Sequence, residues 1–273
     1  MLRCLIGLYA ALGWASACLA AEPIEIRIGY LHGVPSKIKL SLMDVPADND
    51  GLAGAQLAID DDNTTGRFIN QRYVLIDRRI REGDDLGTAI GALADEGVSF
   101  VVSDLDADSL LKAADAGRAR GVVLINAGAT DERLREEDCR ANVVHVAPTR
   151  SMLADGLAQY LAWKKWRKWV LIVGSHDKDK LFAAALRHSA TRFGAKIVDE
   201  REFKDTGGAR RTDSGIVEIQ RQMPVLTQGE PDYDVLVAAD ESEVFAGYLP
   251  YRTWDARPVA GSAGLVPTTW DAS

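Results

Sequence analysis

Short apolar runs alternate with longer amphipathic stretches over most of the chain, and glycine or polar residues bound each run. Runs of this kind predict buried strands, and the stretches between them predict helices. Strands are expected at 24–31, 73–80, 99–104, 121–125, 142–148, 169–174, 195–203, 232–240 and 257–265. Helices are expected at 51–66, 86–97, 109–121, 150–163 and 179–194. This alternation predicts an α/β fold in which mostly parallel sheets are flanked by helices.

Two polar segments interrupt this pattern. Residues 34–50 form a long connection between the first strand and the first helix, and connections of that length in compact domains are usually functional or mobile. Residues 204–231 contain glycines at 207, 208 and 215 and predict only one short helix.

The first 21 residues have the composition of a secretory signal peptide. Arg3 is followed by an apolar stretch that is too short to span a membrane, and small residues follow it. Cleavage there predicts a periplasmic protein, and acylation at Cys18 is the less favoured alternative. Cys139 would then be the last remaining cysteine, so no intramolecular disulfide is expected. The formal net charge of −8 argues against nucleic acid or an anionic membrane as a partner.

Catalytic and metal-binding patterns are incomplete. Residues 175–177 are Ser-His-Asp, but side chains of adjacent residues point in different directions and cannot relay a proton. Nucleotide-binding and hydrolase motifs are absent from the sequence, so an enzyme is not expected. Asp104, Asp106 and Asp108 alternate as in a calcium loop, yet the required glycine and terminal acid are missing. A helix N-cap is the favoured interpretation, and no metal site is predicted.

The segment after the strand at 121–125 has the features of a binding loop. Gly128, Ala129 and Thr130 combine small side chains with one hydroxyl, which leaves backbone N–H groups accessible to an anionic group. Ligands of parallel sheets bind beyond the carboxyl ends of the strands, and nearby arginines can hold a carboxylate with two bonds. Arg135 has the competing option of pairing with Glu136 or Asp138. The predicted ligand-binding residues are Tyr30, Asp104, Asn126, Gly128, Ala129, Thr130, Arg135, Arg150, His176, Asp240 and Arg252.

The order of these parts resembles the periplasmic substrate-binding proteins of amino-acid-type ABC transporters. The resemblance rests on IRIGYL, on G-x-x-G-A-x-x-A at 51–58, on GVVLINAGATDERL and on RFGAKIVDEREF. It implies two α/β lobes that close on a small ligand, and an ABC permease as partner. Lobe one is expected at 22–146 plus 257–273, and lobe two at 147–256. Members of the family continue beyond this length, so the chain is expected to be truncated.

A narrower resemblance concerns a subgroup associated with pyrroloquinoline quinone (PQQ)-dependent alcohol oxidation. It rests on DNDGLAGAQLAIDDDNTTGRF and YLPYRTWDARPVAGSAGL. The resemblance implies PQQ or a related small carboxylate as ligand and a quinoprotein dehydrogenase as a possible partner. Compared with amino-acid binders, the family's carboxylate-binding serine falls near Asp106 or Ala107. Ala263 replaces the acid that pairs with the ligand's ammonium, which argues against leucine-like ligands.

The sequence therefore predicts a non-enzymatic periplasmic solute-binding protein of an ABC transporter that binds PQQ or a related carboxylate. No cofactor is required, although PQQ is possible as the bound ligand. Two alternatives remain open. One is an amino-acid-binding protein for uptake, and the other is a periplasmic sensor or metal-delivery protein of a dehydrogenase system.

Overall fold

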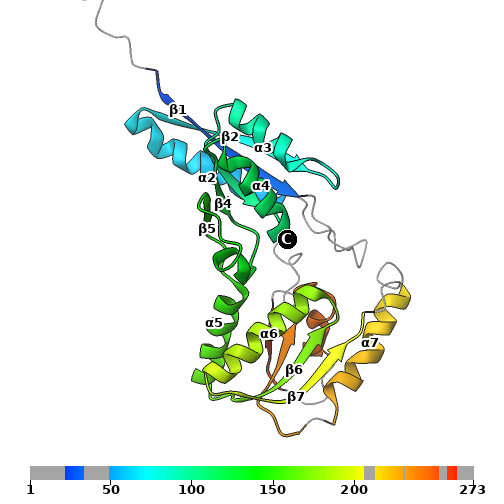
Figure 1. Ribbon diagram of the computed structural model, residues 1–273. Coiled ribbons are helices and arrows are strands. Elements are labelled where there is room, and N and C mark those ends of the chain that lie inside the picture. Colours follow the sequence, from blue (N-terminus) through cyan, green and yellow to red (C-terminus); the bar gives the residue numbers. More distant parts are fainter. Residues whose placement is uncertain (1–21, 34–48, 206–212, 230, 252–256, 263–273) are drawn as a thin grey trace, which may run out of the picture.

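The chain folds into two α/β lobes, as Figure 1 shows for the computed structural model. The structure describes residues 22–33, 49–205, 213–229, 231–251 and 257–262. Lobe one holds a five-stranded sheet in the order β2-β1-β3-β4-β5, and lobe two a four-stranded sheet in the order β7-β6-β8-β9. All the paired strands run parallel, which confirms the predicted fold class.

Lobe one follows the predicted alternation closely. Its helices and strands are β1 (Ile24–Gly33), α2 (Asp50–Gly66), β2 (Gln71–Ile80), α3 (Leu86–Asp95), β3 (Phe100–Asp104), α4 (Ala107–Arg118), β4 (Val123–Asn126) and β5 (Val143–His145). Two short 3-10 turns, η1 (Arg67–Ile69) and η2 (Glu132–Arg135), join them. Asp106 is the N-cap of α4 and accepts a hydrogen bond from the backbone N–H of Ser109 at 3.0 Å. The predicted helix cap is therefore confirmed.

Lobe two begins with the helix that follows β5. Its helices and strands are α5 (Arg150–Trp163), β6 (Lys168–Gly174), α6 (Asp177–Arg192), β7 (Lys196–Phe203), α7 (Asp213–Thr227), β8 (Val235–Ala239) and β9 (Val259–Gly261), with the 3-10 turn η3 (Ala246–Tyr251) before β9. The helix α7 has 15 residues and is longer than the short helix expected in the polar segment 204–231. Its apolar residues Ile219, Met223 and Leu226 are buried at four- and three-residue spacing, a helical period that the flanking glycines obscure in the sequence.

The expected return of residues 257–273 to lobe one is wrong for the described part of that range. β9 pairs with β8 through Leu236↔Val259 and Ala238↔Gly261, so it is an edge strand of the lobe-two sheet. An apolar tripeptide fits the edge of either sheet, and only the pairing decides between them. Residues 263–273, including Ala263, lie outside the described residues, as do the signal segment 1–21, most of the connection 34–50, and Arg252.

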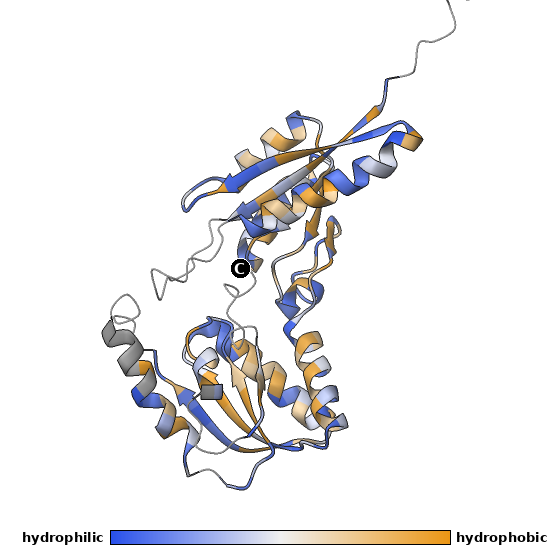
Figure 2. Ribbon diagram, turned by 180° about the vertical axis from the view of Figure 1, so that it is seen from behind, coloured by the Kyte–Doolittle hydropathy of each residue, from blue (hydrophilic) through white to orange (hydrophobic). Residues whose placement is uncertain are grey.

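Lobe two has a hydrophobic core on both faces of its sheet. One face packs against α5 and α6, with Trp169, Leu171 and Phe182 in its core. The other packs against α7 and η3, where the rings of Phe203 and Phe245 stack at 4.7 Å. The central strands are correspondingly apolar along their length, as Figure 2 shows in orange. Two covered faces are the usual arrangement for a parallel sheet.

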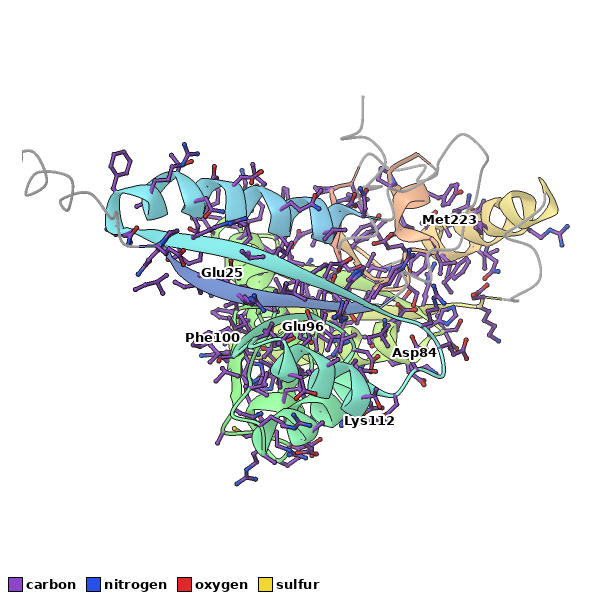
Figure 3. All side chains as sticks on the ribbon, turned by 90° about the horizontal axis from the view of Figure 1, so that it is seen from above. Glu25, Asp84, Glu96, Phe100, Lys112 and Met223 are labelled. Carbon is purple, nitrogen blue, oxygen red and sulfur yellow. The ribbon has the colours of Figure 1, made fainter. Side chains whose placement is uncertain are left out.

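The lobe-one sheet is covered unequally. One face packs against α3 and α4 and forms the core around Leu31, Val101 and Leu124. The other face meets α2 over β2, as the view from above in Figure 3 shows. Beyond α2 this face exposes the side chains of Phe100 and Val144, at 49% and 54% of their accessible surface.

Candidate functional site

The carboxyl ends of β1, β3 and β4 bring several predicted residues to one edge of the lobe-one sheet. His32 lies beside Asp104 in the register of β1 and β3, and Ser103 lies beside Asn126 in the register of β3 and β4. Because the strands are parallel, the loops that follow them leave the sheet on the same side. Tyr30, Asp104 and the loop after Asn126 therefore share this edge.

Asn126 folds the loop that follows it. Its buried side-chain amide donates to the carbonyl of Ala129 at 2.8 Å and accepts from the Ala129 N–H at 2.9 Å. Its backbone carbonyl accepts from the N–H groups of Val146 and Ala147 at 3.0 and 3.1 Å. Both polar parts of the Asn126 amide thus hold backbone, and the residue supports the loop conformation.

The N–H groups on either side of Ala129 make no hydrogen bond within the described residues. Neither the Gly128 N–H nor the Thr130 N–H donates to any atom in the part of the chain that the structure describes. The Thr130 hydroxyl makes no hydrogen bond within that part either, and Thr130 is only half buried. Two N–H groups and a hydroxyl in one short loop match the donors that a carboxylate requires.

Asp104 lies directly against this loop. A Cβ atom placed on Gly128 would come within 2.5 Å of Asp104 Oδ1, so only glycine permits this approach. Across the edge, the Tyr30 hydroxyl donates to Asp104 Oδ2 at 3.3 Å. A Cβ on Gly51, in the first turn of α2, would lie 2.1 Å from that same hydroxyl. Both glycines make room for the Tyr30 and Asp104 side chains. The sequence alone does not indicate this close packing.

Tyr30 is held as a neutral donor. Burial, together with the negative charge of Asp104, raises the pKa of Tyr30 to about 12, so the phenol stays protonated at neutral pH. Its ring stacks on His32 at a centroid distance of 4.7 Å, and His32 Nε2 lies 3.0 Å from Asp77 Oδ1. His32 and Asp77 were not predicted as site residues, although His32 directly follows the predicted strand 24–31 and Asp77 lies within the predicted strand 73–80.

Two arginines near the binding loop, Arg133 and Arg140, are paired with acids. Arg133 forms ion pairs with Asp108 and with Asp138, the latter at 2.9 Å. Arg140 pairs with Asp115 at 2.7 Å. These pairs are at least partly exposed and neutralise the positive charges of Arg133 and Arg140.

Arg135 is held differently from its neighbours. It donates from Nη2 to the carbonyl of Ala147 at 2.6 Å, and among the described residues it pairs with neither Glu136 nor Asp138. Its Nη1 is buried and has no hydrogen-bond partner within the described residues. Arg135 is therefore the one predicted arginine on lobe one whose charge is not met by a described carboxylate.

Arg150 joins the two lobes. Its guanidinium is 6% exposed and pairs with Asp131 of lobe one at 2.9 Å and with Glu241 of lobe two at 2.9 Å. Its backbone N–H donates to the Thr130 carbonyl at 3.0 Å, which fixes the start of α5 to the binding loop. Burial raises the pKa of Glu241, and Arg150 opposes that shift. Asp131 and Glu241 were missed in the sequence because nothing in their spacing links them.

Asp240, which follows β8, binds the backbone of the next turn. Its carboxylate is fully buried and accepts from the N–H groups of Val244, Phe245 and Ala246 at 2.9, 2.7 and 2.7 Å. Burial raises the pKa of Asp240 despite these three bonds. The side chain thus organises the turn before η3 and points into protein rather than toward an open edge.

His176 lies at the carboxyl edge of the lobe-two sheet. The ring Nε2 of His176 is 2.6 Å from Asp205 Oδ2, and the backbone N–H of His176 donates to Asp179 Oδ2 at 3.2 Å. Asp179 is buried and also accepts from the Ser242 N–H at 2.9 Å. A Cβ on Gly174 would lie 2.2 Å from this carboxylate, so glycine is required at the end of β6.

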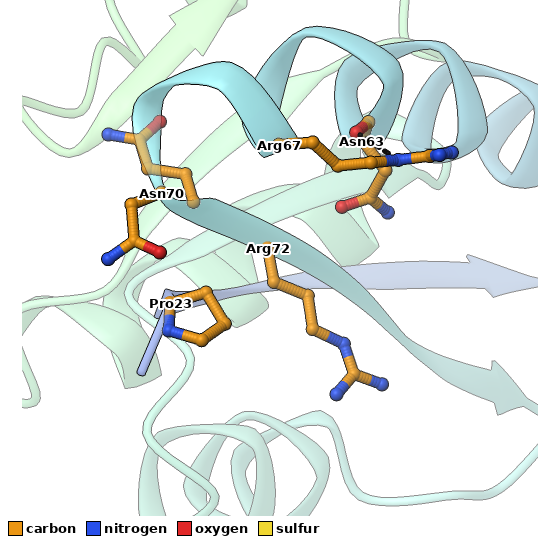
Figure 4. Close-up of a pocket in the computed structure, with 6 residues that line it drawn as sticks. Pro23, Asn63, Arg67, Asn70 and Arg72 are labelled. Atoms are coloured by element: carbon orange, nitrogen blue, oxygen red, sulfur yellow. Dashed lines mark hydrogen bonds between the residues drawn. The ribbon is translucent and has the colours of Figure 1, made fainter. Parts of the chain in front are cut away.

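The pocket drawn in Figure 4 lies away from the carboxyl edge of the lobe-one sheet. Its volume is about 410 Å³, and Pro23, Asn63, Arg67, Asn70, Gln71 and Arg72 line it. Pro23 and Gln71 are at the amino ends of β1 and β2, opposite the ends that carry Tyr30 and Asp104. None of the predicted ligand-binding residues lines it.

The residues that the structure describes hold no group of three or more histidine, cysteine, aspartate or glutamate side chains placed to bind a metal ion. None of the described helices combines the length and apolar character needed to cross a membrane.

Comparison with known proteins decides the family. A family model described as periplasmic binding protein matches residues 39–213, which is more than half of the chain. The chain belongs to the periplasmic binding protein family. A search of curated protein sequences finds no significant match.

Solved structures share the fold of this periplasmic binding protein. The branched-chain amino acid transporter substrate-binding protein LivJ from Streptococcus pneumoniae, in complex with isoleucine, matches with a TM-score of 0.59 and 20% identity over 88% of this chain and 65% of that chain. An ABC transporter substrate-binding protein from Desulfitobacterium hafniense, complexed with Leu, matches with a TM-score of 0.62 and 19% identity over 91% of this chain and 68% of that chain.

A third structure has a broader ligand range in its name. The leucine-, isoleucine-, valine-, threonine- and alanine-binding protein from Brucella ovis matches in a closed conformation with a TM-score of 0.59 and 14% identity over 89% of this chain and 60% of that chain. This periplasmic binding protein thus spans about two thirds of the length of the structures it matches. The similar proteins are substrate-binding proteins rather than enzymes, and the PQQ-associated subgroup remains a prediction.

Proposed function

We propose that this periplasmic binding protein binds a small α-amino acid of the branched-chain class and presents it to an ABC permease. The proposal takes the alternative that the sequence left open, because the solved structures it resembles bind isoleucine and leucine. Export through the segment 1–21 belongs to the same proposal.

The observation that carries the proposal is the uncommitted loop at the carboxyl edge of the lobe-one sheet. The N–H groups of Gly128 and Thr130 and the Thr130 hydroxyl are free of bonds within the described residues, and one carboxylate can engage all three. The Arg150 bridge holds this loop near the lobe-two edge, where His176 and the residues after β8 lie. A ligand held by the loop therefore has a second protein surface opposite it.

The charges favour an amino acid over PQQ. PQQ carries three carboxylates and needs several available cations, whereas Arg133, Arg140 and Arg150 are already ion-paired. Asp104, beside the loop, would repel additional negative charge. A ligand with one carboxylate and one ammonium suits this edge better than a tricarboxylate.

A thermal-shift titration of the secreted chain tests the proposal with leucine, isoleucine and PQQ as separate ligands. A ligand present at 100 times its dissociation constant stabilises the native state by about 2.7 kcal/mol. We expect a saturable rise of the midpoint with leucine or isoleucine and none with PQQ. A rise with PQQ alone would instead support the quinone-linked alternative and contradict the amino-acid proposal.

A further inference from the structure

The amino-acid proposal leaves one group of the ligand without a partner. An α-amino acid brings an ammonium as well as a carboxylate, and leaving such a charge unpaired in a closed site is costly. A carboxylate of this chain must therefore face the ammonium if the proposal is correct.

The structure assigns this role to Asp104: we propose that its carboxylate binds the ligand's α-ammonium and makes this residue the determinant of selectivity for amino acids over simple carboxylic acids. The inference rests on the proposed function. It places both recognition groups on lobe one, the ammonium acceptor at the end of β3 and the carboxylate donors in the loop after β4.

Asp104 is close enough to the loop for one ligand headgroup to reach both. Its Oδ1 lies 2.5 Å from the position a Gly128 Cβ would take, so the carboxylate covers the Cα of a residue whose N–H is uncommitted. The ammonium and carboxylate of an α-amino acid are attached to one carbon atom. The two complementary protein groups are thus neighbours, as the ligand groups are.

The carboxylate of Asp104 is available to a cation. Within the described residues it forms no ion pair, and its one hydrogen bond is the 3.3 Å contact from the Tyr30 hydroxyl. The residue is exposed, in contrast to Asp240, whose oxygens are fully used by backbone N–H groups. Other acids near the loop also have partners: Asp131 forms an ion pair with Arg150, and Asp108 forms one with Arg133.

Tyr30 and the two close glycines fix the position of the Asp104 carboxylate. Tyr30 is a protonated donor at neutral pH and holds Oδ2, while Gly51 and Gly128 leave room on either side. A carboxylate positioned before the ligand arrives loses less conformational freedom on binding. Positioning of this kind is unnecessary for a solvated surface acid.

Titration calorimetry of the secreted chain with two probes tests the inference. Leucine and 4-methylpentanoic acid share the carboxylate and the side chain, and the second lacks the amino group. We expect the parent protein to prefer leucine, and Asp104→Asn to weaken leucine binding by about 10- to 100-fold while changing binding of 4-methylpentanoic acid far less. Asp104→Glu, which keeps the charge, should recover part of the preference.

The control is Asp61→Asn, which removes an exposed carboxylate from α2 away from the loop and should leave both affinities unchanged. Circular dichroism and the thermal midpoint establish that each variant is folded. Equal leucine affinity in the parent and Asp104→Asn would overturn the assignment while leaving amino-acid binding in place. Absence of binding by any branched-chain amino acid to the folded parent would overturn the proposed function and this inference together.

Should Asp104→Asn fail to fold, the parent protein still decides the question. Equal affinity of the parent for leucine and for 4-methylpentanoic acid would overturn the inference, because the ammonium would then contribute nothing to binding. A clear preference for leucine that Asp104→Glu alters, with Asp61→Asn unchanged, would support it.

Discussion

Replacing Arg150 with alanine is expected to destabilise the chain by about 3 kcal/mol, the lower end of the range for breaking a buried ion pair. The guanidinium is almost fully buried and serves two acids, Asp131 on lobe one and Glu241 on lobe two. Its loss leaves two carboxylates close together without a counter-charge. Urea unfolding followed by circular dichroism measures the difference in the free energy of unfolding.

Arg140→Ala is the matched control for this prediction. It removes the same side-chain type from an ion pair in which Asp115 is 56% exposed, and solvent-exposed pairs of that kind contribute little to stability. If the two variants proved equally stable, Arg150 would not be acting as a buried bridge. The comparison separates burial from charge, because both variants lose one positive charge.

Replacing Asp240 with alanine is expected to cost about 2–4 kcal/mol, since three backbone N–H groups lose their acceptor. Val244, Phe245 and Ala246 are buried, so water cannot readily replace the carboxylate. The turn before η3 should loosen, and with it the packing of Phe245 on Phe203. Thermal unfolding of the parent and variant measures the loss.

Asp232→Ala serves as the control for the Asp240 prediction. That carboxylate is 75% exposed and pairs with the exposed Lys168, so the change should leave the unfolding free energy nearly unchanged. A full-sized loss at Asp232, or none at Asp240, would contradict the idea that burial of the acceptor determines the cost.

Most of the fold could be predicted from the sequence because the apolar period changes sharply between strands and helices. The helix α5 was expected at 150–163 and occupies Arg150–Trp163, and the strand expected at 169–174 is β6, Lys168–Gly174. The edge strand β9 was assigned to the wrong lobe since pairing between distant strands leaves no local pattern. The length of α7 was underestimated because polar residues and glycines surround it.

Only part of the candidate site could be predicted from the sequence. The loop at 128–130 follows a buried strand, and its small residues already indicate open N–H groups. The arginines could not be sorted in the same way, because whether Arg150 or Arg135 meets a carboxylate depends on acids that are distant in the sequence. Asp240 has the same residue type as Asp104, and only burial separates an internal acceptor from an available one.

The unequal covering of the two sheets has a consequence for local opening of the molecule. Strands packed on both faces exchange their amide hydrogens only through large, costly openings, whereas strands packed on one face can open locally. We therefore expect β6 and β8 to retain their amide hydrogens longer than β4 and β5 in a hydrogen–deuterium exchange experiment. Equal protection in both sheets would contradict this ranking. The binding loop belongs to the less protected lobe, so ligand binding should slow exchange most where the chain is least stable on its own.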